Sequence, residues 1–143
     1  MILAGIRTYL LSQSAVTDIC GNEIYALRVP QREKIEDHLP AITIGRTSVT
    51  RDYDLDDSAG YVRASIRVDF WGQNYDQIEA LAEAVRVSLL GYAGNLGTHT
   101  AEEIRLNDES DDYDFADDAS DLGLFSISAD YTVAFTETIP THS

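Results

Sequence analysis

Closely spaced aspartates are the residues whose type and spacing most directly suggest chemistry in this chain. Asp52, Asp54 and Asp56 match ligand positions 1, 3 and 5 of the calcium-binding loop of helix–loop–helix proteins. That loop needs glycine at position 6 and a bidentate glutamate at position 12, where this chain has Asp57 and Arg63. We therefore favour a solvated acidic turn over a non-standard cation site, and we expect no bound metal.

Nucleophilic and cofactor chemistry have little support in the residues. Cys20 is the only cysteine, and its place after Ile19 predicts a small buried core residue rather than a nucleophile. The histidines, His38, His99 and His142, are never four residues apart, so no helical metal pair is formed. The chain also lacks a nucleophile elbow, a phosphate-cradling glycine loop and a dinucleotide fingerprint. We expect no catalytic residues, no cofactor and no enzymatic activity.

The charge of the chain is strongly acidic and unevenly placed. Its 143 residues, the length of one domain, include 25 acidic and 10 basic residues, for a net charge of −15. Much of this excess lies between Asp108 and Asp121, which predicts a solvated acidic loop at about residues 107–121. A protein that grips nucleic acid through its phosphates needs lysine and arginine, so the composition argues against that class. A small acidic binding module, with or without a bound cation, fits the composition.

Two alternating stretches predict the main strands that would position any functional residues. Apolar and polar residues alternate strictly from Val62 to Trp71 and again from Phe125 to Thr136, as in strands with one buried face. Shorter strands are expected at residues 24–27, 41–53 and around 104–106.

Helical periodicity occurs twice. Ile78, Leu81, Val85 and Leu89 share one face of a helix over about residues 75–90, capped by Asn74, and a first helix is expected over about residues 2–13. The pattern predicts a single α+β domain over residues 1–143, ending in a short polar tail. Its expected architecture is two-layer, an antiparallel four- to five-stranded sheet with two helices packed on one face. No apolar run approaches the roughly 18 residues of a membrane span, so no membrane partner is expected.

The second face of this sheet is predicted to be polar and available for contact. Arg63, Arg67, Asp69 and Trp71 alternate with the apolar residues of their strand and therefore share that face. Arginine and tryptophan are enriched at protein interfaces. These four residues are our candidates for a subunit interface.

The order of these elements resembles the tail completion, or tail terminator, proteins of long-tailed bacteriophages. The resemblance is carried first by AVTDICGNEIYALRVP after an N-terminal helix, and then by LPAITIGRTS. It continues in VRASIRVDFWGQNYDQIEALAEAVRVSLLG, where a strand ends in an aromatic pair and a short turn leads into a helix, and in the long alternating final strand. The acidic stretch around 107–121 departs from the expected pattern.

The resemblance implies a structural virion protein rather than an enzyme. Such proteins form a ring, commonly hexameric, that caps the tail tube, ends its polymerisation and joins the tail to the head or neck. The implied partners are copies of the chain itself, the major tail tube protein and a head-completion or neck protein, with DNA passing through the lumen without specific binding. A different neck, head-completion or minor tail role is the nearest alternative.

Loop residues are the expected contacts with the tube and neck. The candidates come from the segment 46–60 and from the acidic stretch: Arg46, Arg51, Asp54, Asp111, Asp112, Asp114, Asp117 and Asp118. Acidic residues lining a ring would repel the phosphates of passing DNA, which offers one reason for the net charge. Solubility alone is an equally simple reason.

Overall fold

The computed structural model describes residues 2–26, 40–52, 59–96, 99–114 and 124–138. Within these ranges the helices and strands follow one another as α1 (Ile2–Leu11), α2 (Ser14–Cys20), β1 (Ile24–Ala26), β2 (Ala41–Asp52), β3 (Ala59–Gly72), α3 (Tyr75–Leu89), β4 (Gly94–Leu96), β5 (His99–Asp114) and β6 (Leu124–Thr138). No helix of this described part is both long and apolar enough to cross a membrane.

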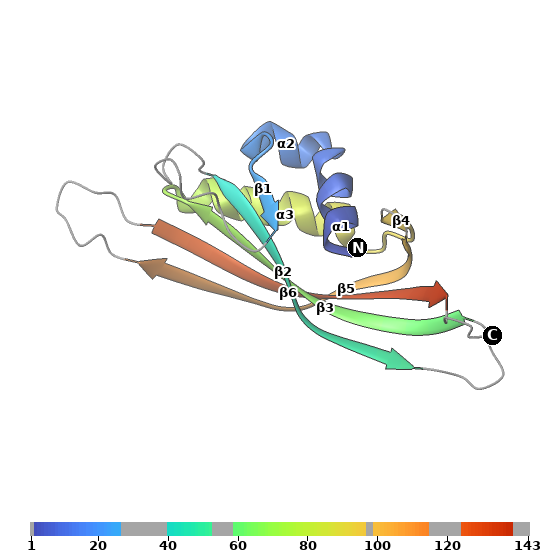
Figure 1. Cartoon of the computed structure of the whole chain (residues 1–143). Coiled ribbons are helices and arrows are strands. Elements are labelled where there is room, and N and C mark those ends of the chain that lie inside the picture. Colours follow the sequence, from blue (N-terminus) through green and yellow to red (C-terminus); the bar gives the residue numbers. More distant parts are fainter. Residues whose placement is uncertain (1, 27–39, 53–58, 97–98, 115–123, 139–143) are drawn as a thin grey trace.

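The six strands form one mixed sheet in the order β1-β2-β3-β6-β5-β4. β1 runs parallel to β2, and the other four pairs of neighbours are antiparallel. The sheet twists strongly and curls into half a barrel, and the three helices lie on one side of it (Figure 1). The predicted four- to five-stranded antiparallel two-layer sheet with two helices is therefore wrong. β1 lies within the strand predicted at residues 24–27, but its parallel pairing with β2 was not expected. The elements α2 and β4 have seven and three residues, too few to produce a clear periodic pattern.

The core lies between the helices and the alternating strands. On β3, every second residue from Val62 to Phe70 is buried. On the neighbouring strand β6, every second residue from Ile127 to Phe135 is buried as well. α3 covers them with its apolar face, which includes Ile78 and Val85. The alternation and the helical period thus predicted this part of the core correctly.

Local hydrogen bonds fix the helices on the sheet. The side chain of Asn74 accepts a hydrogen bond from the backbone N–H of Gln77 at 3.3 Å, which confirms the predicted cap of α3. Tyr9 of α1 donates its hydroxyl to the backbone oxygen of Ser88 at 2.7 Å. Arg7 Nε, also on α1, donates to the backbone oxygen of Ile24 at 2.6 Å. These bonds join α1 to α3 and to β1.

The acidic stretch is partly a strand. β5 pairs with β6 as far as Asp114, opposite Leu124, so the predicted loop is wrong for residues 107–114. Aspartate has a low strand propensity, but hydrogen bonding to a long neighbouring strand overrides it here. Residues 115–123 lie outside the described residues, as does the predicted polar tail from residue 139 onwards.

Candidate functional site

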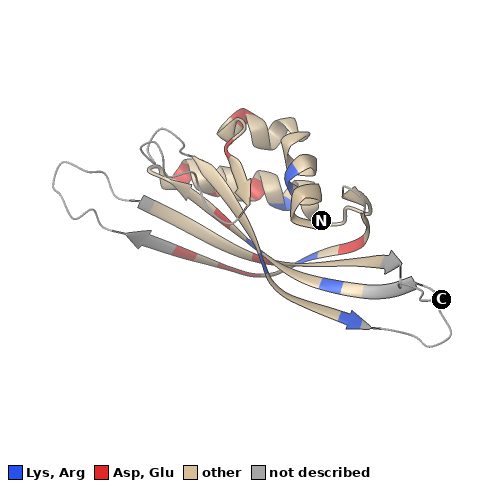
Figure 2. Ribbon diagram, viewed as in Figure 1, with Lys and Arg blue, Asp and Glu red and all other residues tan. Residues whose placement is uncertain are grey.

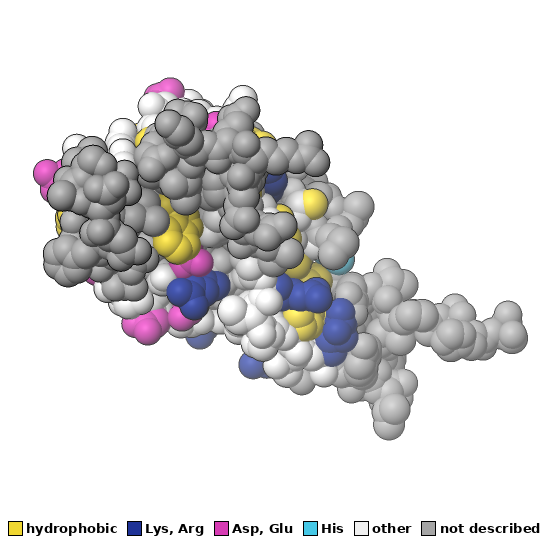
Figure 3. All heavy atoms as spheres, turned by 60° about the vertical axis from the view of Figure 1, so that its left-hand side comes forward, with side chains coloured by type: hydrophobic (Ala, Val, Ile, Leu, Met, Phe, Trp, Pro, Cys, Tyr) yellow, Lys and Arg dark blue, Asp and Glu magenta, His cyan; other side chains and the backbone are white. Residues whose placement is uncertain are grey.

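The sheet face opposite the core carries the four residues predicted for an interface. Arg63 and Arg67 are exposed, and Asp69 and Trp71 are half-buried, all on β3. Their positions follow directly from the alternation of the strand, since the residues between them are buried. We name Arg63, Arg67, Asp69 and Trp71, with their neighbours on β6, the polar sheet face. Figure 3 shows the surface from a second direction, where arginine side chains gather over the strands, some beside carboxylates.

Three side chains form a hydrogen-bonded unit in the middle of this face. Arg67 Nε lies 3.0 Å from Asp69 Oδ1, and Arg67 also donates from its terminal Nη2 to Ser128 Oγ at 3.1 Å. Ser128 Oγ in turn donates to Asp69 Oδ1 at 2.6 Å. The hydrogen bond that Arg67 donates to Asp69, together with the negative charges of Asp69 and Asp130, raises the pKa of Arg67 above its ordinary value. The unit therefore holds a fixed positive charge beside a fixed negative one.

Trp71 is also held by the sheet. Its indole Nε1 donates to Thr43 Oγ1 on β2 at 3.0 Å. Thr43 is 6% exposed and is the one buried polar residue in the described part of the chain, so the indole satisfies a hydroxyl that water does not reach. The ring is thereby fixed in place at the end of the polar sheet face.

Arg63 lies toward the other end of the strand, beside a shallow cavity of about 230 Å³. The cavity is lined by Arg63, Glu103, Arg105, Thr132 and Ala134, which come from β3, β5 and β6. Arg105 Nε and Glu103 Oε1 form an exposed ion pair at 2.6 Å. This cavity extends from the polar sheet face onto β5, and its lining carries both signs of charge.

The residues predicted as loop contacts have three different outcomes. Arg46 and Arg51 are exposed and lie on β2, within the strand predicted at residues 41–53 and not in a loop. Asp111, Asp112 and Asp114 lie on β5, and Asp111 is exposed. The other three residues, Asp54, Asp117 and Asp118, lie outside the described residues.

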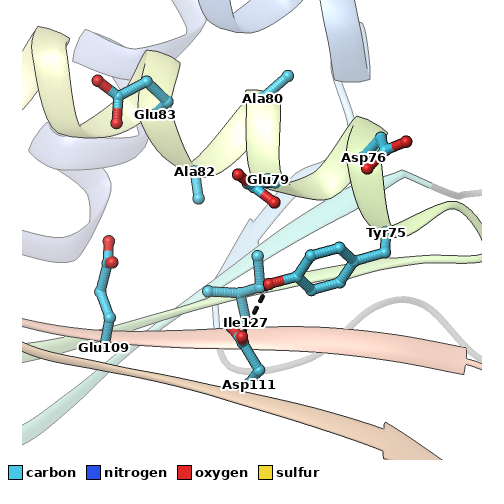
Figure 4. Close-up of a pocket in the computed structure, with 9 residues that line it drawn as sticks. All are labelled: Tyr75, Asp76, Glu79, Ala80, Ala82, Glu83, Glu109, Asp111 and Ile127. Atoms are coloured by element: carbon cyan, nitrogen blue, oxygen red, sulfur yellow. Dashed lines mark hydrogen bonds between the residues drawn. The ribbon is translucent and has the colours of Figure 1, made fainter.

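An acidic groove lies between α3 and β5, on the helix side of the sheet (Figure 4). It has a volume of about 680 Å³ and its lining consists of Tyr75, Asp76, Glu79, Ala80, Ala82, Glu83, Glu109, Asp111 and Ile127. Five of these nine residues are carboxylates, three from the helix and two from the strand. The groove was not predicted, because residues 109 and 111 were assigned to a loop. The signal was the spacing of Asp76, Glu79 and Glu83, which repeats with a helical period.

One hydrogen bond joins the two walls of this groove. The hydroxyl of Tyr75 donates to Asp111 Oδ2 at 2.7 Å, as the dashed line in Figure 4 shows. Because the hydrogen bond favours the protonated phenol, it raises the pKa of Tyr75 to about 12, and burial and the nearby acidic charges add to the shift. On the next turns of the helix, Glu83 and Arg86 form an ion pair.

The cysteine and the described histidine have structural surroundings. Cys20 is buried at the end of α2, and burial raises the pKa of its thiol to about 11, so the thiol is protonated at neutral pH. The ring of His99 packs against that of Phe135, with 4.7 Å between their centroids. Among the described residues, no group of three or more His, Cys, Asp or Glu side chains is arranged to hold a metal ion.

Comparisons with known proteins give one family match and a similar solved structure. The family described as tail completion protein gp17 matches residues 4–133. Among solved structures, the chain is similar to a chain from the virion of a native gene transfer agent particle, with 12% sequence identity, a TM-score of 0.66 and 94% of each chain covered. At that identity the likeness concerns the fold. A search of proteins with curated function gives no match.

Proposed function

Because the chain belongs to the tail completion protein gp17 family, we propose that it forms a ring, of six copies, that caps the tail tube of a phage. The chain is a structural protein of the virion with a role in completing the tail. In our proposal the ring ends polymerisation of the tube protein and offers its other side to a head-completion or neck protein. This role needs neither catalysis nor a cofactor.

The family match over residues 4–133 is the observation that carries the proposal. The structure adds a physical basis for it, since a ring subunit needs a rigid body and a separate surface for contact. The helices seal one side of the sheet over a continuous core. The polar sheet face on the other side is held by hydrogen bonds and carries Arg63, Arg67 and Trp71 toward the surface.

The acidic charge is also consistent with a ring through which DNA passes. A chain with a net charge of −15 raises a negative potential around any opening that its copies enclose. Phosphates are repelled by that potential, so DNA would pass without specific binding.

The assembly is tested by native mass and by tube growth. We expect a species of about 95 kDa, six copies of a 15.8 kDa chain, in light scattering over a concentration series. Negative-stain images should show rings with a central hole. Tubes that assemble from purified tail tube protein should stop growing when the chain is added. Heat-denatured chain serves as the control. Tubes of unchanged length would contradict the capping role.

A further inference from the structure

The described strands cover each edge of the sheet over only a part of its length. β1 pairs with β2 at residues 42–44, and β4 pairs with β5 at residues 99–101. Within the ranges that the structure describes, no strand pairs with the outer edge of either strand beyond those residues. We name residues 45–52 of β2 the β2 edge and residues 102–114 of β5 the β5 edge. Such edges present backbone N–H and C=O groups to which a further strand can bind.

The β2 edge is well suited to strand pairing and carries positive charge. Its sequence is GRTSVTRD, which has two arginines against one aspartate and no proline. Arg46 and Arg51 are both exposed, and between them lie Thr47, Val49 and Thr50, whose branched side chains favour strands. The end of β2 is accordingly blue in Figure 2.

The β5 edge carries the opposite charge. Its sequence is EEIRLNDESDDYD, with seven acidic residues and one arginine. The side chains of Glu102, Asp108, Glu109 and Asp111 are all exposed. Acidic residues recur along this strand in Figure 2.

The topology gives the two edges opposite directions. β2 is antiparallel to β3, β3 to β6, and β6 to β5, so β2 runs antiparallel to β5 across the sheet. A second copy placed beside the first by rotation about a ring axis keeps this orientation. Its β2 edge therefore meets the β5 edge of the first copy as an antiparallel neighbour, the arrangement in which hairpins and meanders pair.

We propose that the β2 edge of one copy pairs with the β5 edge of the next, so that the sheet continues from subunit to subunit around the ring. This inference rests on the proposed ring and identifies the surfaces that close it. Backbone hydrogen bonds supply the pairing, as in other cases of strand addition. Arg46 and Arg51 lie opposite the buried Ile66 and Val62, on the helix side of β2. On the β5 edge, Glu109 and Asp111 lie on that same side, opposite the buried Ala129 and Ile127.

The charges also select this pairing over the alternatives. Two β5 edges, each with six more acidic than basic residues, repel one another, and two β2 edges bring arginines together. Only the head-to-tail contact places opposite charges across the interface. A head-to-tail contact between different surfaces is the type that closes into a ring of any number of copies.

Irregularities along both strands restrict the register of this contact. The pairing of β2 with β3 shifts between Arg46 and Ser48, and that of β5 with β6 shifts at residues 101–103 and 106–108. Such bulges bend a strand and increase its twist, so an edge that carries them fits few partners. A neighbour with the matching curvature, another copy of this chain, is therefore favoured over a flat strand.

Charge reversal on each edge tests the proposal. R46E/R51E makes both edges acidic. E102R/E109R reduces the acidic excess of the β5 edge and brings arginine near arginine, because Glu109 lies on the same side of the sheet as Arg46 and Arg51. Each double variant alone should associate at least about tenfold more weakly than the wild type in light scattering. An equimolar mixture of the two should recover assembly, because the glutamates introduced on one β2 edge then meet the arginines introduced on the neighbouring β5 edge, and the two unaltered edges pair as in the wild type. R46K/R51K keeps the charge and is expected to assemble like the wild type.

Separate measurements distinguish a loss of folding, a loss of assembly and a loss of tube capping. Circular dichroism melts should give each variant a melting temperature close to that of the wild type, because all four side chains are exposed. A wild-type chain that stays monomeric, reversed variants that assemble normally, or a folded mixture that fails to assemble would overturn the edge pairing. The tube-growth assay with the wild-type chain reports on the capping role itself, so failure of the edge contact is distinguishable from failure of the proposed function.

Discussion

At the scale of single residues, hydrogen bonds hold the charged side chains of the polar sheet face in fixed positions. Ser128 lies opposite Asp69 and bonds to both Asp69 and Arg67, so the guanidinium is held across two strands. The Arg67 side chain is 54% exposed, and exposed pairs of this kind contribute at most about 1 kcal/mol to folding. The effect of the unit is therefore to position charge rather than to stabilise the domain.

Tyr75 gives a prediction for alkaline pH. An unfolded tyrosine loses its proton near about pH 10, whereas the bond to Asp111 raises the pKa of Tyr75 in the folded chain to about 12. The contribution of this bond is complete below the unfolded pKa and is lost as the pH rises through the folded one. Y75F lacks the contribution, so its melting temperature should fall less than that of the wild type between pH 9 and 12, as measured by circular dichroism.

Asp111→Asn is the companion variant for this measurement. It replaces the charged acceptor with a neutral one and should also reduce the alkaline loss of stability, while keeping the phenol in place. Superimposable profiles of melting temperature against pH for the wild type and Y75F would contradict the role of the Tyr75–Asp111 bond.

At the scale of elements, α3 is the helix whose packing closes the core. Its residues Val85 and Val87 differ sharply in surroundings, because Val85 is fully buried against the sheet whereas Val87 is 67% exposed. Val85→Asp places an unpaired charge in the core and should lower the free energy of unfolding by more than about 4 kcal/mol, enough to unfold the domain.

Val87→Asp is the matched control for that variant. The same substitution two residues away should change the free energy of unfolding by no more than about 0.5 kcal/mol. Urea denaturation followed by circular dichroism compares the two. A folded V85D variant with near wild-type stability would show that the assignment of the core face of α3 is wrong.

The elements also show where sequence patterns are informative. β3, β6 and α3 each bury every second residue or one helical face over many residues, so their periods were visible in the sequence. β5 was predicted only around residues 104–106, because its second half is acidic and its register shifts twice along β6. Its extension depends on backbone pairing with a distant strand, which no local pattern encodes.

The candidate site also has parts that follow from a local sequence pattern and parts that depend on tertiary structure. The polar sheet face was predicted because alternation alone places Arg63, Arg67 and Trp71 on one side of β3. The acidic groove was missed because it needs α3 and β5 side by side, a tertiary arrangement. The charges of both edges were visible in the sequence, but their role as edges requires the strand order of the whole sheet.

At the scale of the whole molecule, the acidic excess controls which partners approach the chain. With a net charge of −15, duplex DNA should not bind even at about 50 mM salt, where phosphate contacts are strong. A mobility-shift gel with a basic DNA-binding protein of similar size as the positive control checks this. A shift that weakens as salt is added would contradict the idea that DNA passes without binding.

The single thiol of the chain allows local opening of the fold to be measured by chemical labelling. Cys20 is 5% exposed, its pKa is raised to about 11, and it lies where α2 meets the core. A thiol reagent at neutral pH can modify it only when this corner opens, so the labelling rate measures the free energy of local opening. No residue has to be introduced for this purpose, and the same rate, compared between free and assembled protein, would reveal whether assembly stiffens the corner that bears α2.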